Sequence, residues 1–430
     1  MIGCGTVGGG VAQLLHQQRD LYRARLGKTL ELRRVLIRNS NKPRCAEIDP
    51  GIITTDAEAF FTTPGLDIFV EVAGGEGGIS QYVRRVLEMG KHVVTANKSL
   101  LAKHGSELFA LARQNKAAIG FEASCAGGIP IITALQFGLM ANRIDALYGI
   151  LNGTSNYILT EMTQRGKTYV QALREAQQRG FAEADPTLDV SGKDAAQKLA
   201  ILASLAFGVR ADDSLVWCEG IDTLRLEDIR FAAELGYDIK LLGIAERKAG
   251  QDQPLSLRVH PCFVHKTTQL AQVQGPFNAL SIYGHATGHT MYYGRGAGQL
   301  PTASAVVSDL LNIASGWYPH AFAAMNLWCD THQPPQLLDP DELVSRYFLR
   351  ISAKDVPGTM AKVSVILGES GISLGALLQH EVRVGDFVPV VIITHSARQG
   401  SVMRALKQIE RLDIIQGKPV CIRIVDLPEG

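Results

Sequence analysis

An aspartate and a lysine stand four residues apart in the stretch "GFAEADPTLDVSGKDAAQKLAILASLAFG", which begins at Gly180. On a helix, Asp194 and Lys198 share one face. After Lys198 no charged residue occurs until Arg210, and "LAILASLAF" is apolar on all sides, which is typical of a buried helix. Burial disfavours a charged ammonium, which suits a lysine that transfers protons near neutral pH. The alternative interpretation is a structural ion pair.

Further polar residues could serve this pair. Three carboxylates, Glu183, Asp185 and Asp189, precede it in a predicted loop and could bind a substrate ammonium. Lys98 follows the apolar run "KHVVTAN", so it lies at the carboxyl end of a predicted strand, where open α/β sheets bind their ligands. There it could reach a carbonyl or a cofactor phosphate, and the alternative is an ordinary surface lysine.

The chain opens on a glycine run, "MIGCGTVGGG", in which Gly3, Gly5 and Gly8 form G-x-G-x-x-G. Glycines let the backbone turn tightly and approach a phosphate at the start of a helix. The next predicted strand ends at Arg38, near Asn39 and Lys42, and an arginine there favours NADP over NAD because it suits a 2′-phosphate. The alternative is a solvated basic loop.

Only Met1 and Ile2 precede this run, and two residues cannot form the strand that normally leads into it. We expect a version extended by roughly eight apolar-rich residues, about one strand, to have a firmer sheet and to bind NADP more tightly.

Two later turns are also rich in glycine. In "FEASCAGGIP", Glu122 ends a predicted strand, and a carboxylate with backbone carbonyls can hold a hard cation, although a simple turn is the plainer interpretation. In "YYGRGAGQLPTASAVVSDLL", glycines lead into an apolar helix, which makes a second loop capable of backing a cofactor.

The elements that must position these residues follow from the apolar pattern. Strand-like runs at 32–37, 66–73, 91–97 and 117–123 alternate with helical patterns such as 79–90 and 100–115. This alternation predicts an α/β fold with a Rossmann-type parallel sheet over residues 1–125, its first strand truncated. We expect residues of about 300–320 to complete this domain. An α+β substrate domain is expected over 126–300, then a proline-rich linker at 331–345 and a ferredoxin-like β-α-β-β-α-β unit over 346–430.

The composition excludes several classes of partner. Lys and Arg total 43 against 42 acids, so nothing favours a nucleic acid or an anionic membrane. No apolar run is long enough to span a bilayer. The seven scattered cysteines form no C-x-x-C motif and favour reduced thiols in a cytoplasm.

Together these motifs resemble those of homoserine dehydrogenases. The resemblance covers about 1–320 and rests on "GTVGGGV", "TANK", "FEASCAGGIP", "NGTSNYIL", "GFAEADPTLDVSGKDAAQK" and "YGRGAGQLPTASAVVSDL"; the tail from about 345 resembles an ACT domain. It implies NAD(P)-dependent interconversion of L-homoserine and L-aspartate 4-semialdehyde, on the route to threonine, methionine and isoleucine.

The resemblance also implies roles for individual residues. Lys198 would be the acid/base group at the C4 oxygen, and Asp194 would position Lys198 or the substrate. Glu183 and Gly180 would hold the amino acid. The cofactor would be contacted at Gly3, Gly5, Thr6, Val7, Gly8, Arg38, Lys98 and Gly296. A structural sodium ion would be held by Glu122 and by the backbone carbonyls of Cys125, Gly127 and Ile129.

Regulation, assembly and two alternatives complete the expectations. The ACT domain suggests feedback by threonine, and the resemblance favours a homodimer or homotetramer, with a dimerisation role for the domain at 126–300. One alternative is an amino-acid sensor that has lost catalysis, against which the intact lysines and acids argue. The other is a semialdehyde dehydrogenase that acts through a cysteine thiolate, for which Cys125 is the nearest candidate.

Overall fold

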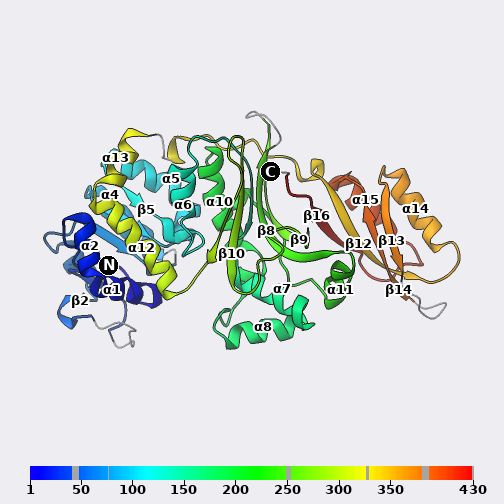
Figure 1. Ribbon diagram of the computed structural model, residues 1–430, viewed down its shortest axis with the longest axis horizontal. Coiled ribbons are helices and arrows are strands. Elements are labelled where there is room, and N and C mark those ends of the chain that lie inside the picture. Colours follow the sequence, from blue (N-terminus) through cyan, green and yellow to red (C-terminus); the bar gives the residue numbers. More distant parts are fainter. Residues whose placement is uncertain (41–47, 76, 248–252, 326–328, 380–386, 429–430) are drawn as a thin grey trace.

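The computed structural model describes residues 1–40, 48–75, 77–247, 253–325, 329–379 and 387–428, so Lys42 and Cys45 lie outside the described residues. Three parts follow one another along the long axis of the molecule: an N-terminal domain, a central domain and a C-terminal domain (Figure 1). Within the described residues, no helix has both the length and the apolar character needed to cross a bilayer.

The N-terminal domain is built on a parallel sheet of short strands. They are β1 (Val35–Leu36), β2 (Ile53–Thr54), β3 (Ile68–Glu71), β4 (His92–Thr95) and β5 (Ile119–Gly120). Ile2 joins β1 to β3 by parallel bridges to Leu36 and Glu71. Its amide donates to the Val70 carbonyl at 2.7 Å. As predicted, residues 1 and 2 form no strand of their own, but Ile2 fills the central position of the sheet, where the motif's strand belongs.

The helices that pack against this sheet come from two separate parts of the chain. They are α1 (Thr6–Gln17), α2 (Arg19–Leu26), α3 (Ala57–Phe61), α4 (Gly77–Glu88) and α5 (Lys98–Gln114), joined by α12 (Gln299–Ala314) and α13 (Trp317–Ala324) from far along the chain (Figure 1). A Cβ on Gly10 would lie 2.9 Å from the Ala303 Cβ, so a glycine in α1 lets α12 approach closely. Residues near 300–320 therefore belong spatially to the first domain.

The central domain is an antiparallel sheet in the order β11-β10-β6-β8-β9. Its strands are β6 (Ile144–Ile150), β8 (Tyr237–Arg247), β9 (Leu255–His265), β10 (Phe277–Gly284) and β11 (Gly288–Arg295), with a short β7 (Trp217–Cys218). Its helices are α6 (Ile131–Thr133), α7 (Gly153–Arg165), α8 (Tyr169–Gln178), α9 (Thr187–Val190), α10 (Lys193–Phe207) and α11 (Leu226–Glu234). The prediction of a buried helix after Asp194 is confirmed, because α10 is buried along most of its length.

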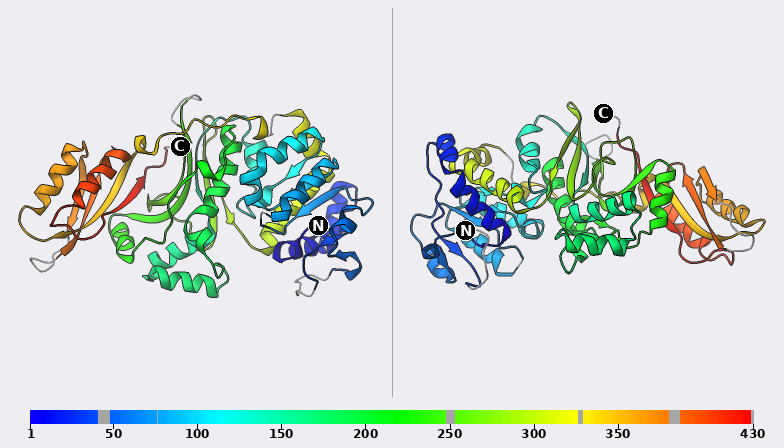
Figure 2. Two further views of the ribbon diagram at one scale, coloured as in Figure 1. Left: turned by 180° about the vertical axis from the view of Figure 1, so that it is seen from behind. Right: turned by 60° about the horizontal axis from the view of Figure 1, so that its bottom comes forward.

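The C-terminal domain has the predicted β-α-β-β-α-β order. It consists of β12 (Val344–Lys354), α14 (Thr359–Glu369), β13 (Leu374–Gln379), β14 (Phe387–Thr394), the two-residue β15 (Ala397–Arg398), α15 (Gln399–Ile409) and β16 (Val420–Val425). The strands lie in the order β16-β12-β14-β13. Figure 2 shows the two helices, α14 and α15, on one face of this sheet.

The central and C-terminal sheets are joined edge to edge. β16 pairs in parallel with β9, with Arg423 opposite Cys262. The Phe263 and Phe348 rings stack with centroids 4.6 Å apart, and Arg350 Nε donates to Asp228 Oδ1 at 2.7 Å. Leu337, within the expected linker, forms a bridge with Leu255 at the start of β9. The C-terminal domain is therefore a continuation of the central sheet and not a tail beyond a free linker.

Candidate active site

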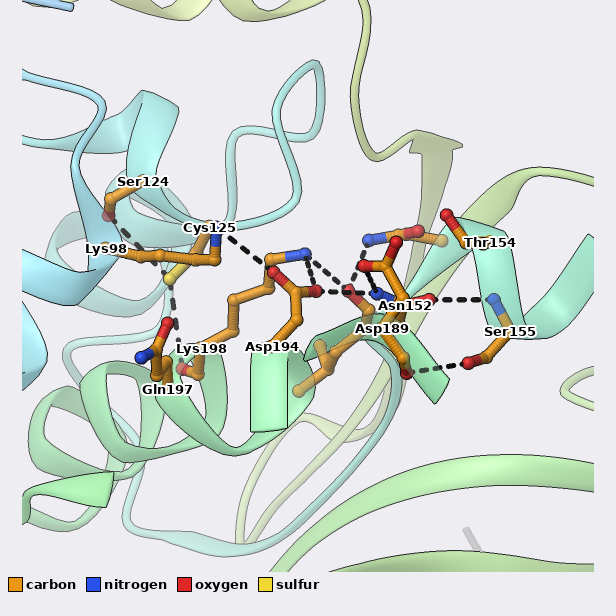
Figure 3. A network of polar contacts seen from close by, with 12 residues as sticks. Lys98, Ser124, Cys125, Asn152, Thr154, Ser155, Asp189, Asp194, Gln197 and Lys198 are labelled. Atoms are coloured by element: carbon orange, nitrogen blue, oxygen red, sulfur yellow. Dashed lines mark hydrogen bonds and ion pairs between the residues drawn. The ribbon is translucent and has the colours of Figure 1, made fainter. Parts of the chain in front are cut away.

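Two lysines from different domains meet at one buried carboxylate. Lys198 Nζ donates to Asp194 Oδ2 at 2.7 Å, and Lys98 Nζ lies 3.1 Å from Asp194 Oδ1 (Figure 3). The side chain of Asp194 is 9% exposed, that of Lys198 is 12% exposed and that of Lys98 is 33% exposed. The two ammonium groups thus share one acid, and the cluster stays accessible mainly from the side of Lys98.

Helix starts place these three side chains. The Asn97 side chain accepts from the Leu100 amide at 3.1 Å and caps α5, so Lys98 is the first residue of that helix, just beyond β4. Gly192, at φ +82°, leads into α10, so Asp194 lies in its first turn and Lys198 one turn later. Ser99 Oγ donates to Gln197 Oε1 at 3.1 Å and ties the two helices together.

The charges at this cluster stabilise one another. Burial alone would raise the pKa of the Asp194 carboxyl, but the ammonium groups of Lys198 and Lys98 outweigh it and hold that pKa well below its usual range. Burial works against the charged form of Lys98, and the Asp194 carboxylate overcomes it, so the pKa of Lys98 is raised. Asp194 is therefore a permanent anion that orients two donors.

Asn152 extends the network toward Asp189. Its Nδ2 donates to Asp189 Oδ1 at 2.7 Å and to Asp194 Oδ2 at 2.8 Å, while its Oδ1 accepts from the Ser155 amide at 2.7 Å and caps α7 (Figure 3). Burial raises the pKa of Asp189. Of the three loop carboxylates proposed as ammonium ligands, Asp189 is thus the one that the structure brings into the network.

A backbone carbonyl and a second amide complete the surroundings of Lys198. The Leu151 carbonyl accepts from Lys198 Nζ at 2.7 Å and from Asn278 Nδ2 at 3.0 Å. Asn278 is 1% exposed, and its Oδ1 has no partner among the described residues. Sequence reasoning missed Asn152 and Asn278, although "NGTSNYIL" directly after a predicted strand was a usable sign of a capping asparagine.

The expected amino-acid ligands Gly180 and Glu183 lie on the loop between α8 and α9. Gly180 has φ +74°, which ends α8 in a left-handed turn, and Glu183 is exposed. The Asp185 carboxylate accepts from the Thr187 amide and hydroxyl, so it caps its own turn. The structure therefore places Glu183 at the surface, on the loop that precedes the helix α9 of Asp189, and outside the lysine network.

The first glycine loop packs too closely for side chains and leads into an uncapped helix start. Gly3 has φ +94°, and a Cβ on it would lie 2.6 Å from the Ala73 Cα; a Cβ on Gly8 would lie 2.7 Å from the Gly3 carbonyl. Gly5 precedes α1 with no side-chain cap, and the first turn, which begins with Thr6 and Val7, contains no acid. Amides at this helix start are therefore available to an anion.

The other expected cofactor residues border the same domain. Arg38 follows β1 and is exposed. Gly296 lies in the loop before α12, where a Cβ would lie 2.1 Å from Cγ, 2.2 Å from Nδ2 and 2.3 Å from Oδ1 of the neighbouring Asn278. A Cβ on Gly127 would lie 2.6 Å from the Gly296 carbonyl, so the second and third glycine turns pack directly on each other.

The expected sodium ligands form a tight turn at the end of the N-terminal domain. Glu122 is 3% exposed; its Oε1 accepts from the Ile132 amide at 2.8 Å, and its Oε2 accepts from the Thr133 amide at 2.8 Å and hydroxyl at 2.6 Å. Burial raises the pKa of Glu122 against these bonds. Since both oxygens already serve the start of α6, carbonyls such as those of Cys125, Gly127 and Ile129 would have to supply most of a cation's ligands. No cluster of three acidic, histidine or cysteine side chains suited to a metal occurs among the described residues.

The thiol of Cys125 is a poor nucleophile. It is fully buried, and burial raises its pKa to about 12. Its Sγ lies 3.8 Å from the backbone carbonyl of Lys198 and makes this contact with the backbone of that lysine and not with its amine (Figure 3). A protonated, covered thiol argues against the alternative of thiolate catalysis.

Comparisons with known proteins agree along the chain. The family model described as homoserine dehydrogenase matches residues 130–311, that described as homoserine dehydrogenase, NAD binding domain matches 3–122, and the ACT domain model matches 347–411. Homoserine dehydrogenase of Pseudomonas aeruginosa is 42% identical over 439 residues, and that of Neisseria gonorrhoeae is 41% identical over 436; both alignments cover 99% of this chain and 98% of the relative. The crystal structure of a homoserine dehydrogenase from Thiobacillus denitrificans is similar with a TM-score of 0.91, at 40% identity, over 99% of this chain and 97% of that one.

Proposed function

Because the chain belongs to the homoserine dehydrogenase family, we propose that Lys198 is its acid/base group and that Asp194 holds this lysine in place. The chain is an NAD(P)-dependent oxidoreductase of amino-acid biosynthesis that interconverts L-homoserine and L-aspartate 4-semialdehyde. The observation that carries the residue assignment is the single buried carboxylate bonded to two lysines from two domains.

The chemistry of the proton follows from this arrangement. The nicotinamide, when bound, accepts or supplies the hydride. As a neutral amine, Lys198 takes the proton from the C4 hydroxyl during oxidation and becomes the ammonium; during reduction this ammonium returns the proton to the oxygen and becomes the amine again. The Asp194 carboxylate and the Leu151 carbonyl fix the direction of Nζ. Lys98, on the other oxygen of Asp194, adds positive charge that stabilises the developing alkoxide.

The cofactor in this proposal is NADP in preference to NAD. Gly3, Gly5 and Gly8, with the amides of Thr6 and Val7, receive the pyrophosphate. Arg38 supports the choice of NADP, because it is exposed two residues after the end of β1, where a 2′-phosphate would lie. Gly296 closes the other side of the site.

The substrate's ammonium group would be held by the loop before α10. Glu183 and Gly180 would contact it from the loop between α8 and α9, and Asp189, which accepts from Asn152 Nδ2, adds a half-buried negative charge next to the lysine network. A sodium ion at the turn of Glu122, Cys125, Gly127 and Ile129 would be structural.

Threonine is the proposed effector of the ACT domain. The proposed assembly is a homodimer or a homotetramer.

The test is nicotinamide absorbance with homoserine, using NADP and NAD in turn. We expect the Lys198→Met variant to lose about 10²–10⁴ in kcat, which is the usual contribution of a general acid/base group. Lys193→Met, an exposed lysine on the same helix, is the matched control and should retain activity. Equal turnover by the two variants would remove Lys198 from the mechanism.

A further inference from the structure

One arginine of the C-terminal domain reaches across the junction with the central domain. Arg423, in β16, is 2% exposed. It donates through Nη1 to Glu219 Oε2 at 3.2 Å, and through Nε and Nη2 to Gln399 Oε1 at 2.9 and 2.7 Å. Its Cζ lies 4.2 Å from the centroid of the Trp217 ring. The guanidinium thus contacts two side chains of the central domain: it forms an ion pair with Glu219 and a cation–π contact with the Trp217 ring.

Arg423 can do this because β7 and β16 share an edge of β9. Trp217 pairs in parallel with Arg258 of β9, and Arg423 pairs in parallel with Cys262, four residues further along the same strand. β8 occupies the opposite edge over the whole length of β9. The C-terminal strand therefore abuts the end of β7, and Glu219 lies where the two strands meet.

The segment 217–221, which consists of β7 and the three residues after it, packs on the start of helix α10. Cys218 Sγ donates to the Ser191 carbonyl at 3.1 Å, and the Ile221 amide donates to the Val190 carbonyl at 2.9 Å. A Cβ on Gly220 would lie 2.4 Å from the Val190 carbonyl, so the two backbones are in direct contact. A displacement of 217–221 would therefore displace residues 190–192 as well.

The geometry points to Arg423 as a positioning residue for the reaction. It holds Trp217 and Glu219, these hold segment 217–221, and that segment sets the start of α10, from which Asp194 reaches both lysines. The inference rests on the proposed role of Asp194. It gives the C-terminal domain a part in the basal reaction that needs no effector. The contacts with Val190 and Ser191 lie just before the first turn of α10, which carries Asp194.

The test compares Arg423→Gln with Arg350→Gln in the full chain. Arg350 is the matched control, since it is also a buried arginine of the C-terminal domain at this junction, but it bonds to Asp228 and Glu227 on α11 and not to segment 217–221. We expect Arg423→Gln to lower kcat about tenfold and to raise the KM for homoserine, because the acid that orients the lysines shifts. NADPH affinity, measured by fluorescence titration, should be unchanged. Arg350→Gln should lower Tm but keep kcat.

Two further variants keep the outcome decisive. Arg423→Lys retains the charge toward Glu219 but loses the fork to Gln399, so we expect an intermediate kcat. If Arg423→Gln does not fold, Glu219→Gln replaces it in the test, because position 219 is exposed. We expect Glu219→Gln to lower kcat as well, but by less than tenfold. Equal kcat and KM in the Arg423 and Arg350 variants would overturn this inference alone. A wild-type chain that does not reduce NADP with homoserine would contradict the proposed function itself.

Discussion

At the scale of single residues, the site depends on side chains that do not touch the substrate in any proposed step. Asn278 shares the Leu151 carbonyl with Lys198, and Asn152 shares Asp194 with the same lysine. The Asn278 amide fixes the Leu151 carbonyl, and the Asn152 amide fixes the Asp194 carboxylate, so both acceptors of Lys198 Nζ are held in place. A lysine ammonium has three donors and four rotatable bonds, so such fixed acceptors convert a flexible group into an oriented one.

Gly296 should tolerate no side chain, for a reason besides cofactor contact. A Cβ would lie 2.1 Å from the Asn278 Cγ, so Gly296→Ala must push this buried amide off the Leu151 carbonyl. We expect kcat to fall about 10²-fold, since small misplacements of a reacting group have costs of that size. Asn278→Ala makes room for the new methyl group, so the double variant should be no slower than Asn278→Ala alone. Additive losses in this double-mutant cycle would refute the coupling.

Lys240 is a buried lysine that the reaction does not use. Its Nζ donates to the Val273 carbonyl at 2.5 Å, and burial lowers its pKa from 10.5 to about 8. Between these values the unfolded chain binds the proton and the folded chain does not, so stability rises as the pH increases from about 8 to 10.5. We expect Lys240→Met to remove about 3 kcal/mol of this rise, the equivalent of the pKa difference. Urea unfolding at both ends of the window checks it, and parallel pH dependences in variant and wild type would rule it out.

At the scale of elements, the start of α10 decides whether Asp194 reaches both lysines. Gly192 has φ +82°, and a Cβ there would lie 2.9 Å from Cys218 Sγ. Gly208, at the other end of the helix, has φ +60° with nothing near a Cβ. We expect Gly192→Ala and Gly208→Ala each to lose about 1–2 kcal/mol of stability through left-handed strain, but only Gly192→Ala to lower kcat. Equal kcat values for the Gly192 and Gly208 variants would mean that the contact with Cys218 does not fix the start of α10.

The sequence allowed some of these elements to be predicted, and the reason is the range of the interactions. Asp194 and Lys198 lie one turn apart, so a local pattern placed them on one face, and the glycine spacing identified the first loop. Asn278 acts on a backbone carbonyl 127 residues away, and a carbonyl has no residue type to recognise. The pairing of β16 with β9 joins strands far apart in the chain, for which neither strand's pattern specifies the partner.

At the scale of the whole molecule, the proposed catalytic cluster lies between two domains, and the third domain is joined to one of them. Lys98 comes from the N-terminal domain, while Asp194 and Lys198 come from the central domain. The C-terminal domain joins the central sheet through β16, so changes in its packing reach the central domain through backbone hydrogen bonds as well as side chains. A regulatory ligand that favoured one packing of this domain would therefore change the contacts of β16 with the central domain, which carries Asp194 and Lys198.

Removal of residues 340–430 should therefore not leave a native enzyme that merely lacks regulation. It uncovers the β9 edge at Cys262, Phe263 and Val264 and leaves the Phe263 ring without its partner Phe348. An exposed edge with apolar side chains pairs readily with other chains. We expect the shortened chain to aggregate and to unfold about 5–10 °C below the full chain, as light scattering and calorimetry would show. A shortened chain that is monodisperse, active and equally stable would contradict this, whereas loss of activity on truncation would say nothing about threonine, whose effect must be measured on the intact chain.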